Sequence, residues 1–170
     1  MRVTSIPRIT ESISISEYVF GAAQRQITYP GLAQCISVTK FSGGLLRGTH
    51  ISPGSSPDEV KEHFRLLNAG SVGQYSDWYV IGQFQEHFRT ANAVMGNMSS
   101  LRQTLRKRLG KGNTFYTFDT SALTASENWA FGIDIRATQQ NYKLEFSFAK
   151  AFGRPDKPFS KLSDWYFTKI

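Results

Sequence analysis

Two residues, Cys35 and His50, are the candidates for covalent chemistry in this sequence of 170 residues. Cys35 is the only cysteine, so an intramolecular disulfide and a cysteine-rich zinc site are both excluded. A thiol of ordinary pKa is mostly protonated at neutral pH, and a neighbouring imidazole that takes its proton leaves a thiolate–imidazolium pair. The thiolate attacks an acyl or amide carbon, and the imidazolium protonates the leaving group. The alternative is that Cys35 is a small buried hydrophobe without a chemical role.

A predicted β-hairpin brings these two side chains together. Residues 35–39 and 45–51 are both β-rich, and the Gly43–Gly44 pair between them favours a tight turn. Folding about this turn places Cys35 and His50 nearly opposite each other, within reach of their side chains.

Alternating apolar and polar residues predict further strands. A second hairpin is predicted from the alternation in residues 129–135 and 142–148, with the polar link 138–141 between its strands. The remaining predicted strands lie at residues 12–16, 77–84, 114–118 and, as a closing strand, 164–167.

Helical patterns are fewer. Ser56 and Glu59 form a capping box around Pro57, and a helix from there should end at Gly70. A second helix is predicted from Ser99 or Ser100 to Gly110, with its leucines on one stripe, and a third is compatible with residues 85–95. The expected fold is α+β in one domain spanning 1–170, with a strand-rich sheet or sandwich core, mostly antiparallel, and two or three flanking helices.

Composition limits the class of protein. Hydrophobic residues make up 40% of the chain and aromatic residues 14%, which is enough for a packed core and excludes general disorder. No apolar run approaches the length of a membrane span, and the N-terminal residues lack the apolar core of a secretory signal peptide. His63 and His87 do not have metal-ligand spacing and are expected at the surface or at its boundary.

The chain is basic, with 20 Lys and Arg against 13 Asp and Glu and a formal net charge of +7. Five of these cations lie within ten positions, in the second predicted helix and directly after it: Arg102, Arg106, Lys107, Arg108 and Lys111. They form either a solvated helix face that complements the helix dipole or a docking surface for an acidic protein. The sequence has no helix-turn-helix, zinc-finger or aromatic RNA-binding motif, which argues against nucleic acid as the partner.

Short motifs surround both candidate residues. GLAQCISV occupies residues 31–38, a glycine-containing turn follows, and GTHISP occupies residues 48–53. Together they resemble the cysteine–histidine core of the bacterial glutamine deamidases. That superfamily includes the chemoreceptor glutamine deamidases, the catalytic domains of the cytotoxic necrotising factors and the Burkholderia lethal factor. The resemblance spans residues 28–53, and a compatible order of strands follows it.

The resemblance implies a role for each matching residue. Cys35 would be the nucleophile and His50 the general base and acid. Some members of the family place a Thr six positions before the Cys, where this chain has Tyr29, with Thr28 one residue further back; Thr28 is therefore the candidate third member. Other members orient the His through a backbone carbonyl. This chain also has Ala33 and Gln34 where the toxins have Ser-Gly.

The implied reaction is hydrolysis of a glutamine side-chain amide on a protein, giving glutamate and ammonia through a thioester. It requires no metal and no organic cofactor. A bacterial toxin or virulence effector is expected, secreted or injected into a target cell and acting on a host protein such as a GTPase or a translation factor. The bacterial cytoplasm is the alternative location. The alternative functions are transamidation on the same cysteine and histidine, and a non-catalytic basic module that binds protein or nucleic acid.

Overall fold

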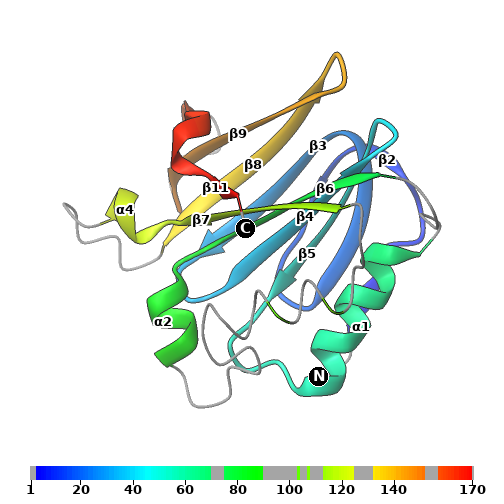
Figure 1. Ribbon diagram of the computed structural model, residues 1–170, viewed down its shortest axis with the longest axis horizontal. Coiled ribbons are helices and arrows are strands. Elements are labelled where there is room, and N and C mark those ends of the chain that lie inside the picture. Colours follow the sequence, from blue (N-terminus) through cyan, green and yellow to red (C-terminus); the bar gives the residue numbers. More distant parts are fainter. Residues whose placement is uncertain are drawn as a thin grey trace.

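One large β-sheet makes up most of the structure. The computed structural model describes residues 3–69, 75–89, 103, 107, 113–124, 132–151 and 157–169. Among these residues the sheet has eleven strands, in the order β10-β9-β8-β3-β5-β4-β6-β7-β11, and β1 and β2 pair with β3 (Figure 1). The strands are β1 (Thr4–Ser5), β2 (Thr10–Ser14), β3 (Val19–Leu32), β4 (Ile36–Ser42), β5 (Leu45–Ile51), β6 (Ser76–Gly82), β7 (Asn113–Asp119), β8 (Ile133–Gln140), β9 (Lys143–Lys150), β10 (Ser160–Lys161) and β11 (Thr168–Lys169). The helices are α1 (Pro57–Asn68), α2 (Phe84–Arg89), α4 (Ser121–Thr124) and the 3-10 helix η1 (Asp164–Tyr166).

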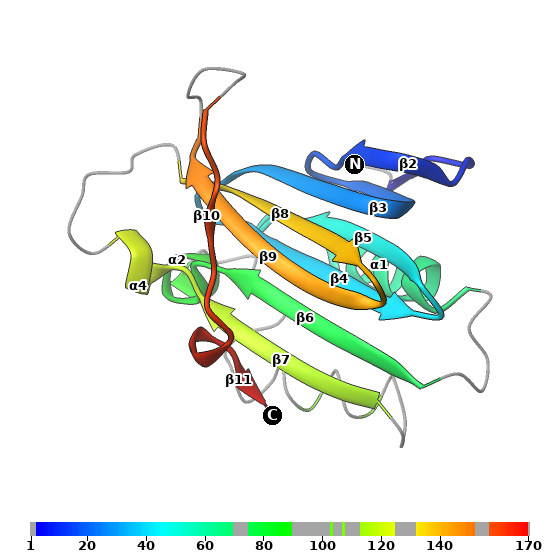
Figure 2. The same ribbon diagram turned by 90° about the horizontal axis from the view of Figure 1, so that it is seen from above.

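The sheet curls until its two halves face each other, and β3 connects them. The first part of β3 pairs antiparallel with β5, and its later part pairs antiparallel with β8. The Tyr29 hydroxyl shares a hydrogen bond of 2.7 Å with the Thr39 hydroxyl of β4. The rings of Tyr79 and Phe146 lie 4.9 Å apart between centroids, and Figure 2 shows β8 and β9 on one side and β6 and β7 on the other. A buried apolar core, which includes Cys35, therefore fills the space between the halves.

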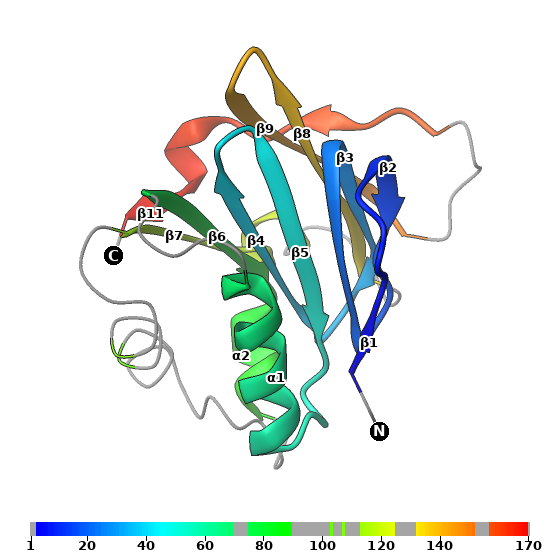
Figure 3. The same ribbon diagram turned by 90° about the vertical axis from the view of Figure 1, so that its right-hand side faces the viewer.

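The first helix covers the opposite face of the sheet. The Ser56 side chain accepts a hydrogen bond from the Glu59 backbone, and the Glu59 carboxylate accepts one from the Ser56 backbone, so the predicted capping box is present. Val60, Phe64 and Leu67 then pack against β4, β5 and β6 in a second apolar core. Helices α1 and α2 lie on the same side of the sheet (Figure 3).

The predicted hairpins are both present, but the link in the second is displaced. β4 and β5 join at Gly43–Gly44, where both residues have positive φ, as the sequence predicts. β8 and β9 also pair as a hairpin. The prediction of a link at residues 138–141 is wrong, because β8 continues to Gln140 and the turn consists of Asn141 and Tyr142, with φ of 51° and 59°.

Two other local predictions are wrong. The expected closing strand at residues 164–167 is instead the 3-10 helix η1, followed by the short strand β11. Pro30 and Gly31 predict a turn within residues 29–34, before Cys35, whereas Tyr29, Pro30 and Gly31 belong to the end of β3. A shift in register between Tyr29 and Leu32 accommodates Pro30, which has no backbone N–H to donate.

The α+β class and the mostly antiparallel pairing are confirmed, although β1 and β2 run parallel to β3 and β6 runs parallel to β7. The arrangement differs from the expected core with flanking helices, because a single curled sheet dominates and α2 and α4 are short. Most of the second predicted helix (99–110), residues 90–95 of the third, and Trp129 and Phe131 lie outside the described residues.

Candidate functional site

The β4–β5 hairpin places Cys35 and His50 on the same face of the sheet. His50 pairs directly with Ser37, and Cys35 precedes β4 by one position, so the two lie on one diagonal of the hairpin. The Cys35 thiol sulphur and a ring nitrogen of His50 lie within 4.8 Å of each other. The hairpin therefore produces the expected proximity, and the chemical role of the pair stays a prediction.

A third side chain, Glu17, joins them from a different part of the chain. Cys35 Sγ donates a hydrogen bond of 3.2 Å to Glu17 Oε1. A Glu17 carboxylate oxygen also lies within 4.8 Å of a His50 ring nitrogen. Glu17 stands on the turn between β2 and β3, where Tyr18 has a φ of 60° and its backbone N–H donates to the His50 carbonyl. This contact ties the turn to the end of β5.

A backbone carbonyl determines the tautomer of His50. Nδ1 lies 3.2 Å from the carbonyl oxygen of Ile15, and a carbonyl can only accept, so the proton is on Nδ1. Nε2 therefore carries a lone pair. It is buried and has no hydrogen-bond partner among the described residues, and the whole residue is only 1% exposed.

Burial favours the neutral form of both groups in the resting site, and the Glu17 charge favours it for the thiol only. Burial raises the pKa of the Cys35 thiol, and the negative charge of Glu17 and the hydrogen bond to it raise that pKa further. A hydrogen bond with Ser52 opposes this effect. Burial also lowers the pKa of His50, against the Ile15 hydrogen bond and the Glu17 charge. The resting pair is thus thiol and neutral imidazole.

A pocket opens over Cys35, with a volume of about 540 Å³. Its lining comes from the ends and connections of several elements that meet at one end of the sheet: Glu17, Gly31, Ala33, Gln34, Cys35, Ser52, Pro53, Gln83 and Glu86. Cys35 is only 4% exposed. A ligand that reaches the thiol therefore enters through this pocket.

Close packing fixes the backbone around the cysteine. A Cβ atom added at Gly82, the last residue of β6, would lie 2.6 Å from the Cys35 carbonyl oxygen and 3.1 Å from the Ile36 Cα. His87 of α2 places Nδ1 2.8 Å from the carbonyl oxygen of Gln34 and donates to it. The peptide before Cys35 is therefore held by a buried side chain.

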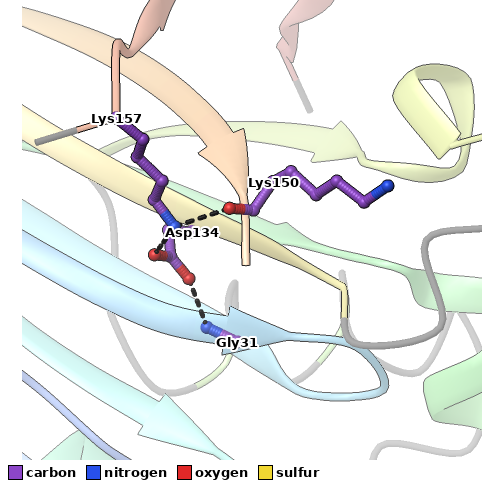
Figure 4. Close-up of polar contacts among 4 residues, drawn as sticks. All are labelled: Gly31, Asp134, Lys150 and Lys157. Carbon is purple, nitrogen blue, oxygen red and sulfur yellow. Dashed lines mark hydrogen bonds and ion pairs between the residues drawn. The ribbon is translucent and has the colours of Figure 1, made fainter. Parts of the chain in front are cut away.

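The rim of the pocket is held by a charge pair from distant parts of the chain (Figure 4). Asp134 of β8 accepts a hydrogen bond of 2.8 Å from the Gly31 backbone N–H. The same carboxylate pairs with Lys157 at 2.6 Å, and Lys157 also donates to the carbonyl oxygen of Lys150. The side chains of Asp134 and Lys157 are 14% and 15% exposed, so the pair is mostly desolvated.

Thr28 does not join the cysteine and histidine. It lies on β3, between Ser14 of β2 and Arg136 of β8, and it does not line the pocket. Its connection to the site is indirect, since its carbonyl accepts from the Ile15 backbone N–H and the Ile15 carbonyl accepts from His50. The group that orients His50 in this structure is thus the second alternative, a backbone carbonyl.

The other two histidines are buried, which corrects the expectation of surface positions. His63 is fully buried and its Nδ1 bonds to the Thr49 hydroxyl. His87 is 1% exposed and bonds to Gln34, as described above. Both pack where helices meet the sheet, and a polar partner for each allows burial.

The basic cluster is mostly beyond the described part of the chain. Lys107 is an exposed helical residue, and Arg102, Arg106, Arg108 and Lys111 lie outside the described residues. Within the described ranges no helix is long and apolar enough to cross a membrane.

Comparison of the sequence with models of known protein families and with curated proteins gives no match.

Proposed function

We propose that the protein is a cysteine-dependent protein glutamine deamidase, with Cys35 as nucleophile and His50 as general base and acid. The observation that supports this proposal most directly is the tautomer of His50 and the position of its ring. Its Nδ1–H donates to the Ile15 carbonyl, which leaves the Nε2 lone pair buried and without a hydrogen-bond partner among the described residues. A nitrogen of the same ring lies within 4.8 Å of the thiol sulphur. An imidazole prepared in this way can accept a proton from the thiol and return it to a leaving group.

The proposed reaction uses these two side chains in four steps. Nε2 takes the thiol proton, and the thiolate sulphur bonds to the carboxamide carbon, whose π electrons move to oxygen. The tetrahedral intermediate collapses, the C–N bond breaks, and the imidazolium gives its proton to the departing nitrogen, which leaves as ammonia. A water molecule then attacks the thioester carbon, and Nε2 takes a proton from that water. The C–S bond breaks, the imidazolium returns its proton to the sulphur, and glutamate is released.

We also assign roles in the reaction to three other side chains that line the pocket. Glu17 accepts a hydrogen bond from the resting thiol, so the S–H group exchanges this partner for His50 before its proton passes to Nε2. Gln34 and Gln83 line the pocket, and their side-chain amides are the donors that we assign to the oxyanion.

The test uses a pool of peptides with internal glutamines, incubated with the full chain and analysed by mass spectrometry and an ammonia assay. Conversion adds about one dalton at glutamine, because an amide becomes an acid. Cys35→Ser should abolish conversion. His50→Asn keeps a donor toward the Ile15 carbonyl but has no base at the Nε2 position, so the rate should fall by about 10² to 10⁴.

The result that would contradict the proposal is conversion at the wild-type rate in both variants. A wild-type chain that converts no glutamine, in peptides or in intact proteins, would also contradict it. Circular dichroism of each variant separates loss of activity from loss of folding.

The carboxylates of Glu17 and Glu86 line the same pocket and favour a second candidate, transamidation, because a carboxylate attracts the ammonium form of an acceptor amine. Adding a primary amine to the peptide assay distinguishes the two. A mass gain that matches the amine less ammonia identifies transamidation.

The motif resemblance also bears on the substrate and on the biological role of the proposed deamidase. A protein substrate is expected, and a bacterial toxin or effector that acts on a host protein is the context in which such a deamidase is used. Docking through the basic residues near Lys107 belongs to this part of the proposal.

A further inference from the structure

Three side chains with metal-binding atoms meet at the pocket. A Glu17 carboxylate oxygen, the Cys35 sulphur and a His50 ring nitrogen lie within 4.8 Å of one another. Ligand atoms around one tetrahedral zinc ion lie about 3.5 Å apart, given bond lengths of about 2.0 to 2.3 Å. The distance of 3.2 Å between Cys35 Sγ and Glu17 Oε1 is already close to that value.

His50 has the arrangement that a metal-binding histidine needs. Histidines that bind metals usually donate the other ring N–H to a carbonyl or carboxylate, which fixes the ring and its tautomer. Here Nδ1 donates to the Ile15 carbonyl. Nε2 is buried and has no hydrogen-bond partner among the described residues, so its lone pair is available for a ligand.

The types of these three ligand atoms favour zinc over other common metal ions. Thiolate and imidazole favour zinc and its neighbours over magnesium or calcium, and zinc also accepts a carboxylate. One thiolate and one carboxylate balance the two charges of the ion, so no net charge is added to a mostly buried site. Three protein ligands leave a fourth position, and the pocket over Cys35 gives access to it.

We propose that Glu17, Cys35 and His50 form a zinc-binding site, and that zinc bound there blocks the thiol. As the Zn–S bond forms, the S–H proton leaves to solvent and the sulphur lone pair is occupied by the metal. Nε2 is occupied in the same way, so neither group can act on a carboxamide. The site itself needs only these side chains, and its consequence for activity depends on the proposed function.

The first test measures binding alone. Zinc chloride is titrated into the chelator-treated full chain by calorimetry, and cobalt chloride is used to record the thiolate-to-cobalt absorption band. We expect one ion per chain and a cobalt band that is absent in Cys35→Ser. Glu17→Gln and His50→Asn should each weaken zinc binding by at least about tenfold.

The matched control is Glu86→Gln, which changes another carboxylate in the pocket lining that is outside the three-residue group. Its zinc affinity should equal that of the wild type. In the wild-type chain zinc should also slow alkylation of Cys35 by iodoacetamide, a result that needs no variant to fold.

Absence of saturable zinc binding, or equal affinity in Cys35→Ser, would overturn the site. Glutamine conversion that rises when zinc is added would overturn the blocking role. If zinc binds as expected but no glutamine is converted without it, the proposed function fails and the metal site stands, so the two failures are distinguishable.

Discussion

Glu17 adds to the effect of burial on the resting Cys35 thiol. Its carboxylate accepts a hydrogen bond from the S–H group, and both this bond and the negative charge raise the pKa of the thiol. Glu17→Gln keeps the size of the side chain but removes the charge, so the thiol pKa should fall and the thiolate fraction at a given pH should rise. We expect faster alkylation by iodoacetamide near neutral pH, with the rate profile displaced to lower pH.

Glu86→Gln is the control for this experiment. Glu86 lines the same pocket but pairs with Arg89 at 2.6 Å, so its replacement should leave the alkylation profile where it is in the wild type. An unchanged profile in Glu17→Gln would show that the carboxylate does not govern the thiol.

Two members of the candidate site can be identified from the sequence, and the others cannot. Cys35 and His50 are predictable because a short hairpin fixes their relation through local pairing. Glu17 is not, since it reaches the thiol from a turn eighteen positions away in the chain. The Ile15 carbonyl is not either, because a backbone group has no identity in the sequence.

At the scale of elements, the approach of β6 to β4 depends on the absence of a side chain at Gly82. A methyl group there would lie 2.6 Å from the Cys35 carbonyl oxygen, so Gly82→Ala must displace the backbone that carries the thiol. We expect a loss of about 2 kcal/mol in the free energy of unfolding by urea. The rate of Cys35 alkylation should change as well.

The control is Gly54→Ala. The nearest atom to an added Cβ there is the Tyr18 hydroxyl at 3.5 Å, an ordinary contact. Its effect on the free energy of unfolding should stay within about 0.5 kcal/mol. Equal effects of the two substitutions would show that the contact between β6 and Cys35 is not tight.

The Asp134–Lys157 pair connects β8 to the rim of the pocket. Asp134→Asn keeps an oxygen that can accept from the Gly31 backbone but leaves the Lys157 ammonium without its counter-charge in a mostly buried position. The free energy of unfolding should fall by about 3 kcal/mol, the lower end for a broken buried pair, because Lys157 keeps its bond to the Lys150 carbonyl.

Glu145→Gln tests the same kind of change at the surface. Glu145 pairs with Lys161 at 2.8 Å, but the two side chains are 49% and 64% exposed, so the loss should be within about 0.5 kcal/mol. A loss for Asp134→Asn as small as this would mean that the pair at the rim does not stabilise the fold.

Elements with strong local sequence patterns could be predicted, whereas β3, which connects the two halves of the sheet, could not. The capping box of α1 and the Gly43–Gly44 turn are local in sequence and are found where expected. β3 is missed because its first part contains small residues and its end contains Pro30, which interrupts the alternation. Its length is set by pairing with β5 and then β8, contacts that no local pattern records.

At the scale of the whole molecule, buried histidines link stability to pH. Burial lowers the pKa of His63 from an ordinary 6.5 to about 4, and it also lowers the pKa values of His50 and His87. The unfolded chain therefore binds more protons than the folded chain below about pH 6.5, so stability is present above that pH and is lost as the pH falls toward 4.

For His63 alone this loss amounts to about 3 kcal/mol at full protonation. Urea unfolding measured from pH 7 to pH 4 should show it as a falling free energy. In His63→Asn, which keeps a donor toward the Thr49 hydroxyl but does not titrate, the slope against pH should be smaller. An identical slope in the variant would contradict the role of His63, whatever its absolute stability.

If Cys35 attacks a glutamine carboxamide with the help of His50, as we propose, a thioester on Cys35 forms during turnover and can be trapped. The full chain is mixed with a glutamine peptide that it converts, quenched in acid, digested and analysed by mass spectrometry. We predict that the Cys35-containing fragment gains the peptide mass less ammonia in the wild type, and that the adduct is absent in Cys35→Ser. Turnover without this adduct, an adduct on another residue, or the absence of any reaction would contradict the account.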